Sequence, residues 1–447
     1  FAPPYPPHGD LRKKARRPRA VVRLTRIACG YAALRGLMFG GVATISPLVQ
    51  ADDIVAAREL LSDVISPTPM LYSRVLSELT GGPVYLKCEN LQRTGSFKVR
   101  GAYTRIARLS DAERARGVVA ASAGNHAQGV AFAAGLLGAA ATVVMPERAP
   151  LPKAEATRAY GASVILHGSS VEDALDEALR FSERTGAVFI HPFDHPDIVA
   201  GQGTLGFELI EQCPGVRTVL VPVGGGGLAA GIAVALQSLD PAVQVVGVQA
   251  AAVPGVIASV AAGAPVQVVG APTMADGIAV QRPGDIPFAI LAEAGVRVVA
   301  VSEAALARAL LLCLERAKQV VEPSGAAGVA ALLEGLGEVE PPAVVVLSGG
   351  NIDPLLLSKL LRHGLSAAGR YLGFRCRVPD YPGSLAALLG LLAGLGANVL
   401  EVSHERLAPT LRVDEVEVVL QVETRGPAHC AHVKDALRSA GYDLAFS

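Results

Sequence analysis

The sequence has no excess charge of either sign, because 40 Lys and Arg residues balance 40 Asp and Glu residues. A balanced chain lacks the positive field with which proteins attract nucleic acid or anionic membranes, so neither is expected as a main partner. The sequence also lacks a run of about 20 uncharged apolar residues, the length that crosses a bilayer. Arg35 interrupts the best candidate, residues 28–49. No membrane-spanning segment is therefore expected.

Cysteine is scarce, and no two cysteines form a C-x-x-C pair. The six stand at positions 29, 88, 213, 313, 376 and 430. Scattered cysteines indicate reduced thiols in a cytoplasmic protein and disfavour a disulfide framework or a zinc site. The run from His191 to His195 (HPFDH) suggests a metal site at first sight. We expect it instead to shape a loop beside the functional site, with no metal bound.

Residues 1–45 differ in composition from the rest of the chain. The stretch from Phe1 to Arg26 contains eight Lys or Arg residues, several prolines and one acidic residue, Asp10. This composition is typical of a disordered basic arm or a targeting segment. Transit peptides are usually rich in serine, which this segment lacks, so the preferred alternative is a true start at Met38. In either case the arm is expected to carry no chemistry.

The most informative stretch runs from Glu89 to Ala102 and reads ENLQRTGSFKVRGA. It places Lys98 directly after a Thr-Gly-Ser turn, at the start of a predicted helix. A lysine that forms a Schiff base needs a fixed stem and a partly desolvated amine, because only the neutral amine is nucleophilic. Taken alone, the motif fits a surface lysine after a turn better than a catalytic one.

A second motif, Ala121 to Gly129 (ASAGNHAQG), follows an apolar run, Val118 to Ala121, that is predicted to be a buried parallel strand. It leads into a predicted helix, Val130 to Leu137. Strand, polar turn and helix together direct free backbone N–H groups at an anion, here a substrate carboxylate. Asn125 adds an amide that can hydrogen-bond a phenolic oxygen. An ordinary helix N-cap is the alternative.

A third motif contains four consecutive glycines and a leucine: Gly224, Gly225, Gly226, Gly227 and Leu228. It lies between a predicted strand and a predicted helix, so its backbone can close around a phosphate at the helix N-terminus. A dinucleotide fingerprint would also require an acidic residue at the end of the next strand. That strand, Val243 to Gln249, ends in an uncharged glutamine. A phosphate ester of mononucleotide size is therefore favoured over NAD.

A fourth motif, Ala343 to Asn351 (AVVVLSGGN), predicts another buried strand that ends in Ser348 and two glycines. A serine in this position can donate a hydrogen bond to a ring nitrogen or accept one from it. Taken alone, this motif is only a strand-ending turn.

Together the four motifs resemble those of the fold-type-II pyridoxal-phosphate enzymes, and most closely those of the threonine and serine dehydratases (ammonia-lyases). The similarity runs from about Leu48 to about Leu361. The family pattern S-F-K-x-R-G-A is matched at 96–102, S-A-G-N-H-x-Q-G at 122–129 and G-G-G-G-L at 224–228.

The resemblance implies a pyridoxal phosphate cofactor bound to Lys98 as a Schiff base, with Phe97 packed against its ring. Asn125 would bind the 3′-oxygen, Ser348 the pyridine nitrogen, and the amides of 224–228 the phosphate. The substrate carboxylate would be held by the turn of Ser122, Ala123, Gly124, Asn125 and His126. The freed Lys98 amine would act as general base on the Cα proton.

Three positions narrow the implied activity, and a fourth is expected to lie near the site. A neutral hydroxyl at Ser348 does not keep the pyridine protonated, which favours β-elimination over reactions that linger at the carbanion. Similar serine racemases carry a hydroxyl where this chain has Ala123, so racemisation is not expected. Some relatives use an acidic residue at the position of Gln249 to bind a divalent metal. A neutral amide binds Mg²⁺ or Ca²⁺ more weakly than a carboxylate does, so no such metal is expected here. Glu322 precedes the Ser348 strand and is expected to face the site.

Alternating strands and helices predict an α/β fold of two doubly wound lobes for residues 46–361, with the small lobe inserted at about 95–187. A linker is expected at 362–370. Residues 371–447 show the order β-α-β-β-α of a small α+β ferredoxin-like domain.

The C-terminal segment resembles an ACT domain through D-x-P-G-x-L at 380–385 and G-A-N-V-L at 396–400. In that family the turn, here Asp380, Pro382 and Gly383, and the region of Asn398 bind a free amino acid, often between two such domains. Only one copy is present, which implies pairing between the subunits of a homodimer or homotetramer. A dimerisation module without a ligand is the alternative.

The sequence therefore predicts a pyridoxal-phosphate-dependent enzyme that converts L-threonine to 2-oxobutanoate and ammonia, as the first step of isoleucine biosynthesis under allosteric amino-acid control. A dehydratase that prefers L-serine is an alternative, because one methyl group is worth only about 1–3 kcal/mol in a pocket. A catalytically silent amino-acid sensor is the other. The intact set of Lys98, Asn125, the four glycines and Ser348 disfavours a sensor, which would not need them all.

Overall fold

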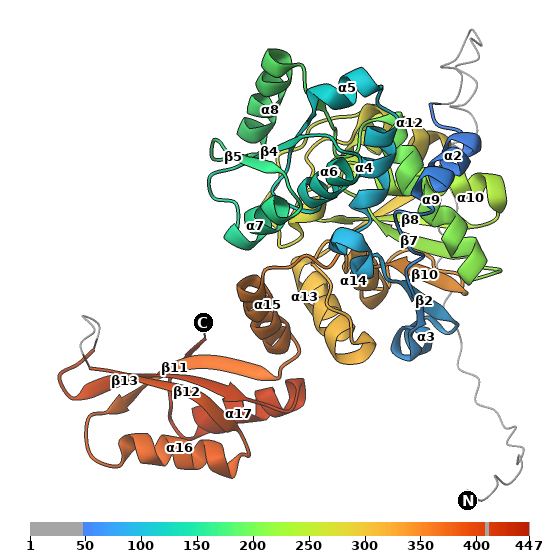
Figure 1. The fold of residues 1–447 in the computed structure, drawn as a ribbon. Coiled ribbons are helices and arrows are strands. Elements are labelled where there is room, and N and C mark those ends of the chain that lie inside the picture. Colours follow the sequence, from blue (N-terminus) through green and yellow to red (C-terminus); the bar gives the residue numbers. More distant parts are fainter. Residues whose placement is uncertain (1–47, 407–410, 447) are drawn as a thin grey trace, which may run out of the picture. The chain divides into compact units, whose positions relative to one another are not determined.

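The computed structural model describes residues 48–406 and 411–446. The expectations for a basic arm at 1–45 and for a start at Met38 lie outside the described residues, as does Cys29. The described chain contains three β-sheets and the helices around them (Figure 1). Its five cysteines are all free and buried, as the scattered pattern predicted. Among the helices of these residues, none has the length and apolar character needed to cross a membrane.

The largest sheet has six strands in the order β1-β2-β10-β7-β8-β9. Their bounds are β1 Met70–Tyr72, β2 Val84–Lys87, β7 Thr218–Pro222, β8 Gln244–Ala250, β9 Arg297–Val301 and β10 Ala343–Val346. Neighbouring strands are parallel except β1, which pairs antiparallel with β2. Because β10 lies between β2 and β7, strands from the two ends of the stretch 70–346 lie side by side in this sheet.

Apolar side chains cover both faces of the large sheet, because alternate residues of each strand point to opposite sides. Leu220 and Val345 belong to one buried core, with α3 Arg74–Thr80, α13 Glu303–Leu312 and α14 Ala327–Leu333. Val219 and Val344 belong to the other, with α2 Ala51–Leu61, α9 Pro196–Gln212, α10 Gly227–Leu239 and α12 Asp285–Glu293. The sheet is therefore doubly wound, as predicted.

A second sheet has the order β5-β4-β3-β6 and is parallel throughout. Its strands are β3 Val118–Ala121, β4 Ala141–Met145, β5 Ser163–Leu166 and β6 Val188–Phe189. The helices of this part of the chain are α4 Lys98–Ala107, α5 Asp111–Arg116, α6 Asn125–Leu136, α7 Leu151–Ala159 and α8 Val171–Thr185. Most of these elements fall inside the predicted small lobe, 95–187, although the division into lobes itself stays a prediction.

A third, antiparallel sheet has the order β12-β13-β11-β14. Its elements are β11 Tyr371–Pro379, α16 Ser384–Gly394, β12 Asn398–Glu405, β13 Glu415–Glu423, α17 Pro427–Ser439 and β14 Leu444–Phe446. Phe374, Val418, Leu388 and Val433 meet in its core. The order is that of a ferredoxin-like fold, as predicted. Only β14 was not predicted, because three residues are too few to show a strand pattern.

The other differences from the sequence prediction concern the ends of elements. α6 begins at Asn125 and not at Val130, because the residues that suggested a turn form the first turn of the helix. α15 Pro354–Ala367 extends through most of the segment that was predicted as a linker. Gly364, which suggested the linker, instead allows close packing of α15 on α13, since a Cβ there would lie 3.1 Å from the carbonyl oxygen of Ala307.

Candidate active site

Three loops of the predicted site follow the carboxyl ends of parallel strands. The glycine loop follows β7, Ser348 comes shortly after β10, and Ser122 follows β3. In doubly wound folds, ligands bind outside this edge of the sheet. The structure therefore gives all three sequence motifs the position that a binding site requires.

Lys98 is the first residue of α4, and the chain before it is fastened to the end of β10. The amide of Phe97 donates to the carbonyl oxygen of Ser348 over 3.2 Å, and the amide of Gly350 donates to that of Gly95 over 2.9 Å. Gly95 has a φ of 71°, which residues with a side chain rarely adopt. Two motifs that lie far apart in the sequence are thus joined through their backbones.

The Lys98 amine is partly buried beside an aromatic ring. Its Nζ donates to the carbonyl oxygen of Pro192 over 2.9 Å and lies 5.2 Å from the centre of the Phe97 ring. Burial lowers the pKa of Lys98 from 10.5 to about 8, although the carboxyl of Glu322 acts in the opposite direction. The neutral amine, which nucleophilic attack and proton abstraction both require, is therefore accessible near neutral pH.

Asn125 is the first residue of α6, and its amide group connects two other segments. Its Nδ2 donates to Oε1 of Glu322 over 2.6 Å, and its Oδ1 accepts from Nδ2 of Asn351 over 2.9 Å. Asn351 also donates to the carbonyl oxygen of Thr94 over 2.6 Å. Asn125 is thus linked, through Asn351, to the turn that precedes Lys98.

Glu322 is buried against Asn125, so it does face the site. Burial raises the pKa of its carboxyl from 4.5 to about 7, and the nearby Asp276 carboxylate adds to this effect. The hydrogen bond from Asn125 acts in the opposite direction. The result is a carboxyl group that gains or loses its proton near neutral pH.

The glycine loop has no room for side chains. A Cβ at Gly225 would overlap the ring of Phe193, and one at Gly224 would lie 3.0 Å from the Cα of Ile278. Gly226 has a φ of 96°, and it precedes α10 without a side-chain cap. Within the described chain, the amides of 224–226 donate no hydrogen bond to another backbone group. Free amides at an uncapped helix N-terminus fit a phosphate group.

The turn after β3 is also formed. The hydroxyl of Ser122 accepts from the amide of Gly124 over 3.1 Å. His126 is buried with Nε2 2.8 Å from the carbonyl oxygen of Ile190, and burial lowers its pKa from 6.5 to about 3. Its ring is therefore neutral and already bonded. Of the predicted carboxylate-binding turn, His126 offers its backbone but not its side chain.

The run from His191 to His195 forms a loop beside Lys98, as predicted. Besides the Pro192 carbonyl, the loop contributes Phe193, which packs on the glycine loop. Asp194 accepts from the amide of Ile286 over 2.9 Å, at the start of α12. In the described parts of the chain, no group of three or more His, Cys, Asp or Glu side chains is arranged to hold a metal ion. Gln249 is fully buried, and its Oε1 accepts from the amide of Ile257 over 3.1 Å, in α11 Gly255–Ala262.

Three residues near the site, Asn351, Pro192 and Lys153, were not predicted from the sequence to have a role. Asn351 is the last residue of the SGGN motif, so the sequence could have indicated its role. Pro192 acts through a backbone carbonyl, which no side-chain pattern reveals. Lys153 of α7 forms an ion pair of 3.0 Å with Asp276, and only the fold brings these two residues together.

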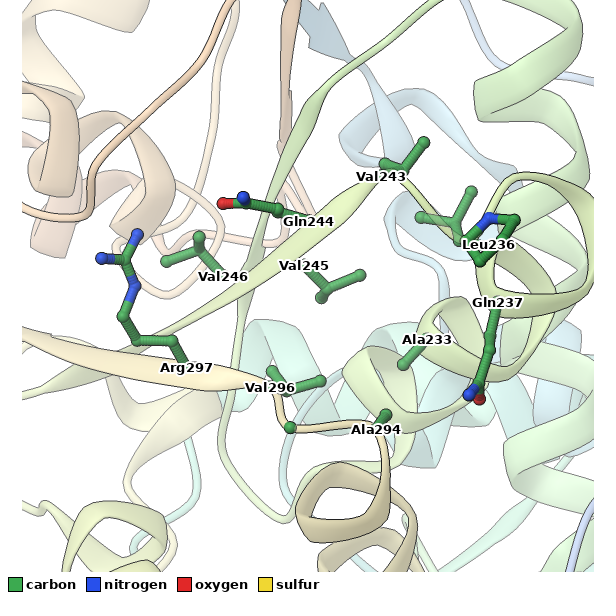
Figure 2. Close-up of a pocket in the computed structure, with 12 residues that line it drawn as sticks. Ala233, Leu236, Gln237, Val243, Gln244, Val245, Val246, Ala294, Val296 and Arg297 are labelled. Carbon is green, nitrogen blue, oxygen red and sulfur yellow. The ribbon is translucent and has the colours of Figure 1, made fainter. Parts of the chain in front are cut away.

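A hollow at the opposite edge of the large sheet is separate from this site. It is lined by Ala233, Leu236, Gln237, Pro241, Val243, Gln244, Val245, Val246, Ala294, Gly295, Val296 and Arg297 (Figure 2). These residues lie at the starts of β8 and β9 and at the ends of α10 and α12. The glycine loop follows the other end of the neighbouring strand β7.

A second hollow, of about 290 Å³, lies in the C-terminal segment. Asp380, Pro382 and Gly383, three of the predicted effector residues, line it together with His404 and Arg406. Arg406 pairs with Asp380 over 3.1 Å. The volume is near the lower end of the range for small-molecule pockets.

Asn398, the fourth predicted effector residue, does not line this hollow. It pairs with Glu423 at one end of β13, whereas Pro379 pairs with Glu415 at the other end. The eight-residue separation along a strand corresponds to about 27 Å. A single copy of the segment therefore does not bring Asn398 next to Asp380.

The model of a family described as pyridoxal-phosphate dependent enzyme matches residues 61–349, more than half of the chain. The chain therefore belongs to this family, whose members use pyridoxal phosphate. The match includes Lys98, Asn125, the glycine loop and Ser348. The residues present fit the cofactor, since a lysine with a lowered pKa and a loop of free amides lie at the same edge of the fold.

Among the relatives, an L-threonine ammonia-lyase from Thermotoga maritima is 49% identical over 397 residues, which cover 89% of this chain and 99% of the relative. The catabolic L-threonine dehydratase TdcB from Escherichia coli K12 is 43% identical over 315 residues, covering 70% of this chain and 96% of the relative. The crystal structure of a threonine deaminase from T.th. aligns with a TM-score of 0.65 and 42% identity, covering 68% of this chain and 99% of that one. The structure of maize serine racemase aligns with a TM-score of 0.67 and 34% identity, and the alignment covers 71% of this chain and 98% of that one.

Proposed function

We propose that this protein is a pyridoxal-phosphate-dependent L-threonine ammonia-lyase, which converts L-threonine to 2-oxobutanoate and ammonia. The relatives that carry this name support the choice of substrate. The observation that carries the proposal is the partly buried Lys98 amine, which lies beside Phe97 and is fastened to the end of β10. A lysine with a lowered pKa at the carboxyl edge of a doubly wound fold suits proton transfer at the Cα of an amino acid.

The cofactor would be held by residues of all three loops. Lys98 would form the covalent link, and the free amides of Gly224, Gly225, Gly226, Gly227 and Leu228 would bind the phosphate. Asn125 would donate to the 3′-oxygen, Phe97 would pack on the ring, and Ser348 would meet the ring nitrogen. When bound, pyridoxal phosphate supplies an electron sink for the electron pair left at Cα after its proton is removed.

The residues of the chain then have distinct tasks. The turn of Ser122, Ala123, Gly124 and the amides of Asn125 and His126 would bind the substrate carboxylate. The neutral Lys98 amine would take the Cα proton. The Cβ–O bond would then break, and the proton taken from Cα would leave with the hydroxyl group as water. Hydrolysis of the resulting enamine would give 2-oxobutanoate and ammonia. Water lost in one step is regained in the next, so the overall reaction is the deamination of threonine.

We propose that the C-terminal segment, 371–447, is an ACT domain that binds a free amino acid and controls the enzyme. The hollow is lined by the Asp380 carboxylate and by the Arg406 guanidinium that pairs with it. These two groups could bind the ammonium and the carboxylate of a free amino acid. Asn398 is too far from this hollow within one copy, so a complete site would form between two copies. β12 is an edge strand with exposed Leu400 and Val402, which suits pairing in a homodimer or homotetramer.

A feedback inhibitor with a branched side chain, such as L-isoleucine, would place the reaction at the first step of isoleucine biosynthesis. A cytoplasmic location is part of the same proposal. The catalytic proposal and the regulatory proposal are independent, since the first depends on the three loops and the second on the C-terminal hollow.

One experiment tests both proposals. Formation of 2-oxo acid is measured from L-threonine and from L-serine with added pyridoxal phosphate, each with and without L-isoleucine. Faster turnover of threonine, suppressed by isoleucine, is expected. Faster turnover of serine would make L-serine the preferred substrate. A rate that isoleucine does not change would exclude isoleucine as the effector. If neither amino acid gives a 2-oxo acid, the catalytic proposal is overturned in favour of an amino-acid sensor.

A further inference from the structure

Four charged side chains form a buried cluster behind the lysine-bearing helix. They are Lys87 at the end of β2, Glu89 just after it, Arg100 in α4 and Glu208 in α9. Their side chains are at most 7% exposed. The cluster contains two positive and two negative charges, and none of the four was assigned a role in binding or catalysis above.

Arg100 is the centre of the cluster. Its guanidinium donates to both carboxylate oxygens of Glu89, over 2.7 and 2.9 Å, and to Glu208 over 2.7 Å. It also donates to the hydroxyl of Thr204 over 3.1 Å. Lys87 completes the cluster by donating to Glu208 over 2.5 Å. Arg100 therefore uses its planar fork to fix the first turn of α4 against two other elements.

Stability alone does not account for such a cluster. Moving charges out of water is costly, and well-packed apolar residues often stabilise a core as much as a buried ion pair does. What hydrogen-bonded ion pairs add is direction, because their hydrogen bonds weaken steeply outside a narrow range of distance and angle. The cluster is therefore best suited to holding one arrangement of the helices that carry it.

The helices around Lys98 need such a device. α6 and α9 approach α4 through glycines. A Cβ at Gly129 would lie 3.2 Å from the carbonyl carbon of Lys98, and one at Gly201 would lie 2.7 Å from the Cα of Gly101. Smooth glycine contacts allow close approach but do not fix the rotation of a helix about its axis. Because residues two apart on a helix face different sides, Arg100 can hold this rotation while Lys98 faces the site.

We propose that the cluster of Lys87, Glu89, Arg100 and Glu208 positions Lys98: it fixes the rotation of the first turn of α4, so that the lysine amine stays against the Pro192 carbonyl and away from water. These are positioning residues and do not touch the reacting atoms. The inference rests on the proposed role of Lys98 as the cofactor-bearing lysine.

The variant Glu208→Gln distinguishes a positioning role of the cluster from a direct effect of its charge on the pKa of Lys98. Removal of a negative charge would by itself lower the pKa of Lys98 further, whereas a loosened helix that admits water would raise it from about 8 towards 10.5. Glu322, which raises the pKa of Lys98, is unchanged in this variant, and so are His126 and His191, whose pKa values Lys98 lowers. The two explanations therefore predict shifts of opposite sign.

The measurement is the pH at which the acetylation rate of the Lys98 amine reaches half its maximum in the cofactor-free protein, read by peptide mass spectrometry under competitive labelling. The matched control is Glu211→Gln, which removes a carboxylate of the same helix that pairs with Arg58 over 2.7 Å at the surface. We expect a rise of one pH unit or more for Glu208→Gln and no shift for Glu211→Gln. No rise, or a fall, in Glu208→Gln would overturn the proposal.

A second variant covers the case that Glu208→Gln does not fold, as judged by circular dichroism and gel filtration. The double change Lys87→Met and Glu208→Gln removes one charge of each sign and leaves the Arg100–Glu89 pair intact. The same rise is expected, and its absence counts equally against the proposal. Borohydride reduction of the wild-type holoenzyme is done in parallel. If it traps the cofactor on another lysine, the proposed role of Lys98 fails, while the acetylation result still reports on helix position.

Discussion

Nδ2 of Asn125 and Oε1 of Glu322 lie 2.6 Å apart, and this contact connects the start of α6 to the segment that precedes α14. The amide that is proposed to bind the cofactor's 3′-oxygen is thereby paired with a carboxyl group whose pKa is about 7. The protonation state of Glu322 and the hydrogen bonding of Asn125 are consequently coupled near neutral pH.

Glu322→Gln should change how stability depends on pH. The pKa of Glu322 is raised from 4.5 to about 7 in the folded protein, so its contribution to stability is present below pH 4.5 and is lost as pH rises to about 7. The wild type should lose about 3 kcal/mol over this interval from this group, which the glutamine variant would not lose. Denaturant unfolding of the cofactor-free proteins at pH 5 and pH 8 measures the difference. Parallel pH curves for the two proteins would contradict the assignment.

Lys98→Met should abolish turnover and yet stabilise the cofactor-free protein. The pKa of Lys98 is lowered from 10.5 to about 8, so the stability that the neutral amine confers is present above pH 10.5 and is lost as pH falls to about 8. Below pH 8 the variant should be more stable than the wild type by about 3 kcal/mol, and this gap should close between pH 8 and 10.5. Melting temperatures across this pH range test it. Measurable turnover in the variant would refute the role of Lys98.

Gly225→Ala should weaken cofactor binding. The added Cβ would overlap the Phe193 ring, so either the glycine loop or the loop beside Lys98 must move. We expect the dissociation constant of pyridoxal phosphate to rise at least tenfold, equivalent to about 1.4 kcal/mol. Gly135→Ala in α6 is the matched control, since its Cβ would make only an ordinary contact of 3.4 Å. Equal affinity in the two variants would argue against this loop as the phosphate site.

Asn351→Asp should lower kcat more than it changes KM. Nδ2 of Asn351 donates to the Thr94 carbonyl over 2.6 Å and to Asn125 over 2.9 Å. An aspartate would place a negatively charged acceptor against two other acceptors, at a cost of about 1–3 kcal/mol. The expected fall in kcat is about 10- to 100-fold, measured by 2-oxo acid formation from threonine. A large rise in KM with an unchanged kcat would instead place Asn351 at the substrate.

The parts of the fold that could be predicted are those with a local signature. The apolar run Val118 to Ala121 predicted a buried strand directly, and the order β-α-β-β-α was predicted for the C-terminal segment. The structure has both. The helical character of 362–367 could not be predicted in this way, because Gly364 signals a break unless the helix that it packs against is known. The helix start at Asn125 was missed for a related reason, since polar residues and glycine form a first turn as readily as a loop.

The candidate site shows the same limit. Side chains in sequence motifs, such as Lys98 and Asn125, could be selected as candidates from the chain alone. The contacts of Pro192 and Lys153 could not, because a backbone carbonyl has no residue-specific pattern and an ion pair between distant residues depends on the fold. The distance between Asn398 and Asp380 could not be predicted either, since it follows from strand register and not from residue type.

The position of β10 between β2 and β7 has a consequence for the synthesis of the protein. β2 is made early, but its parallel partner, 343–346, leaves the ribosome only after nearly the whole catalytic region has been translated. Until then β2 and β7 each have an edge without its partner strand, and such edges invite pairing with other chains. The smaller parallel sheet, 118–189, is complete much earlier. A message truncated before codon 343 would therefore give an aggregating fragment with one finished sheet, and not a weakened enzyme.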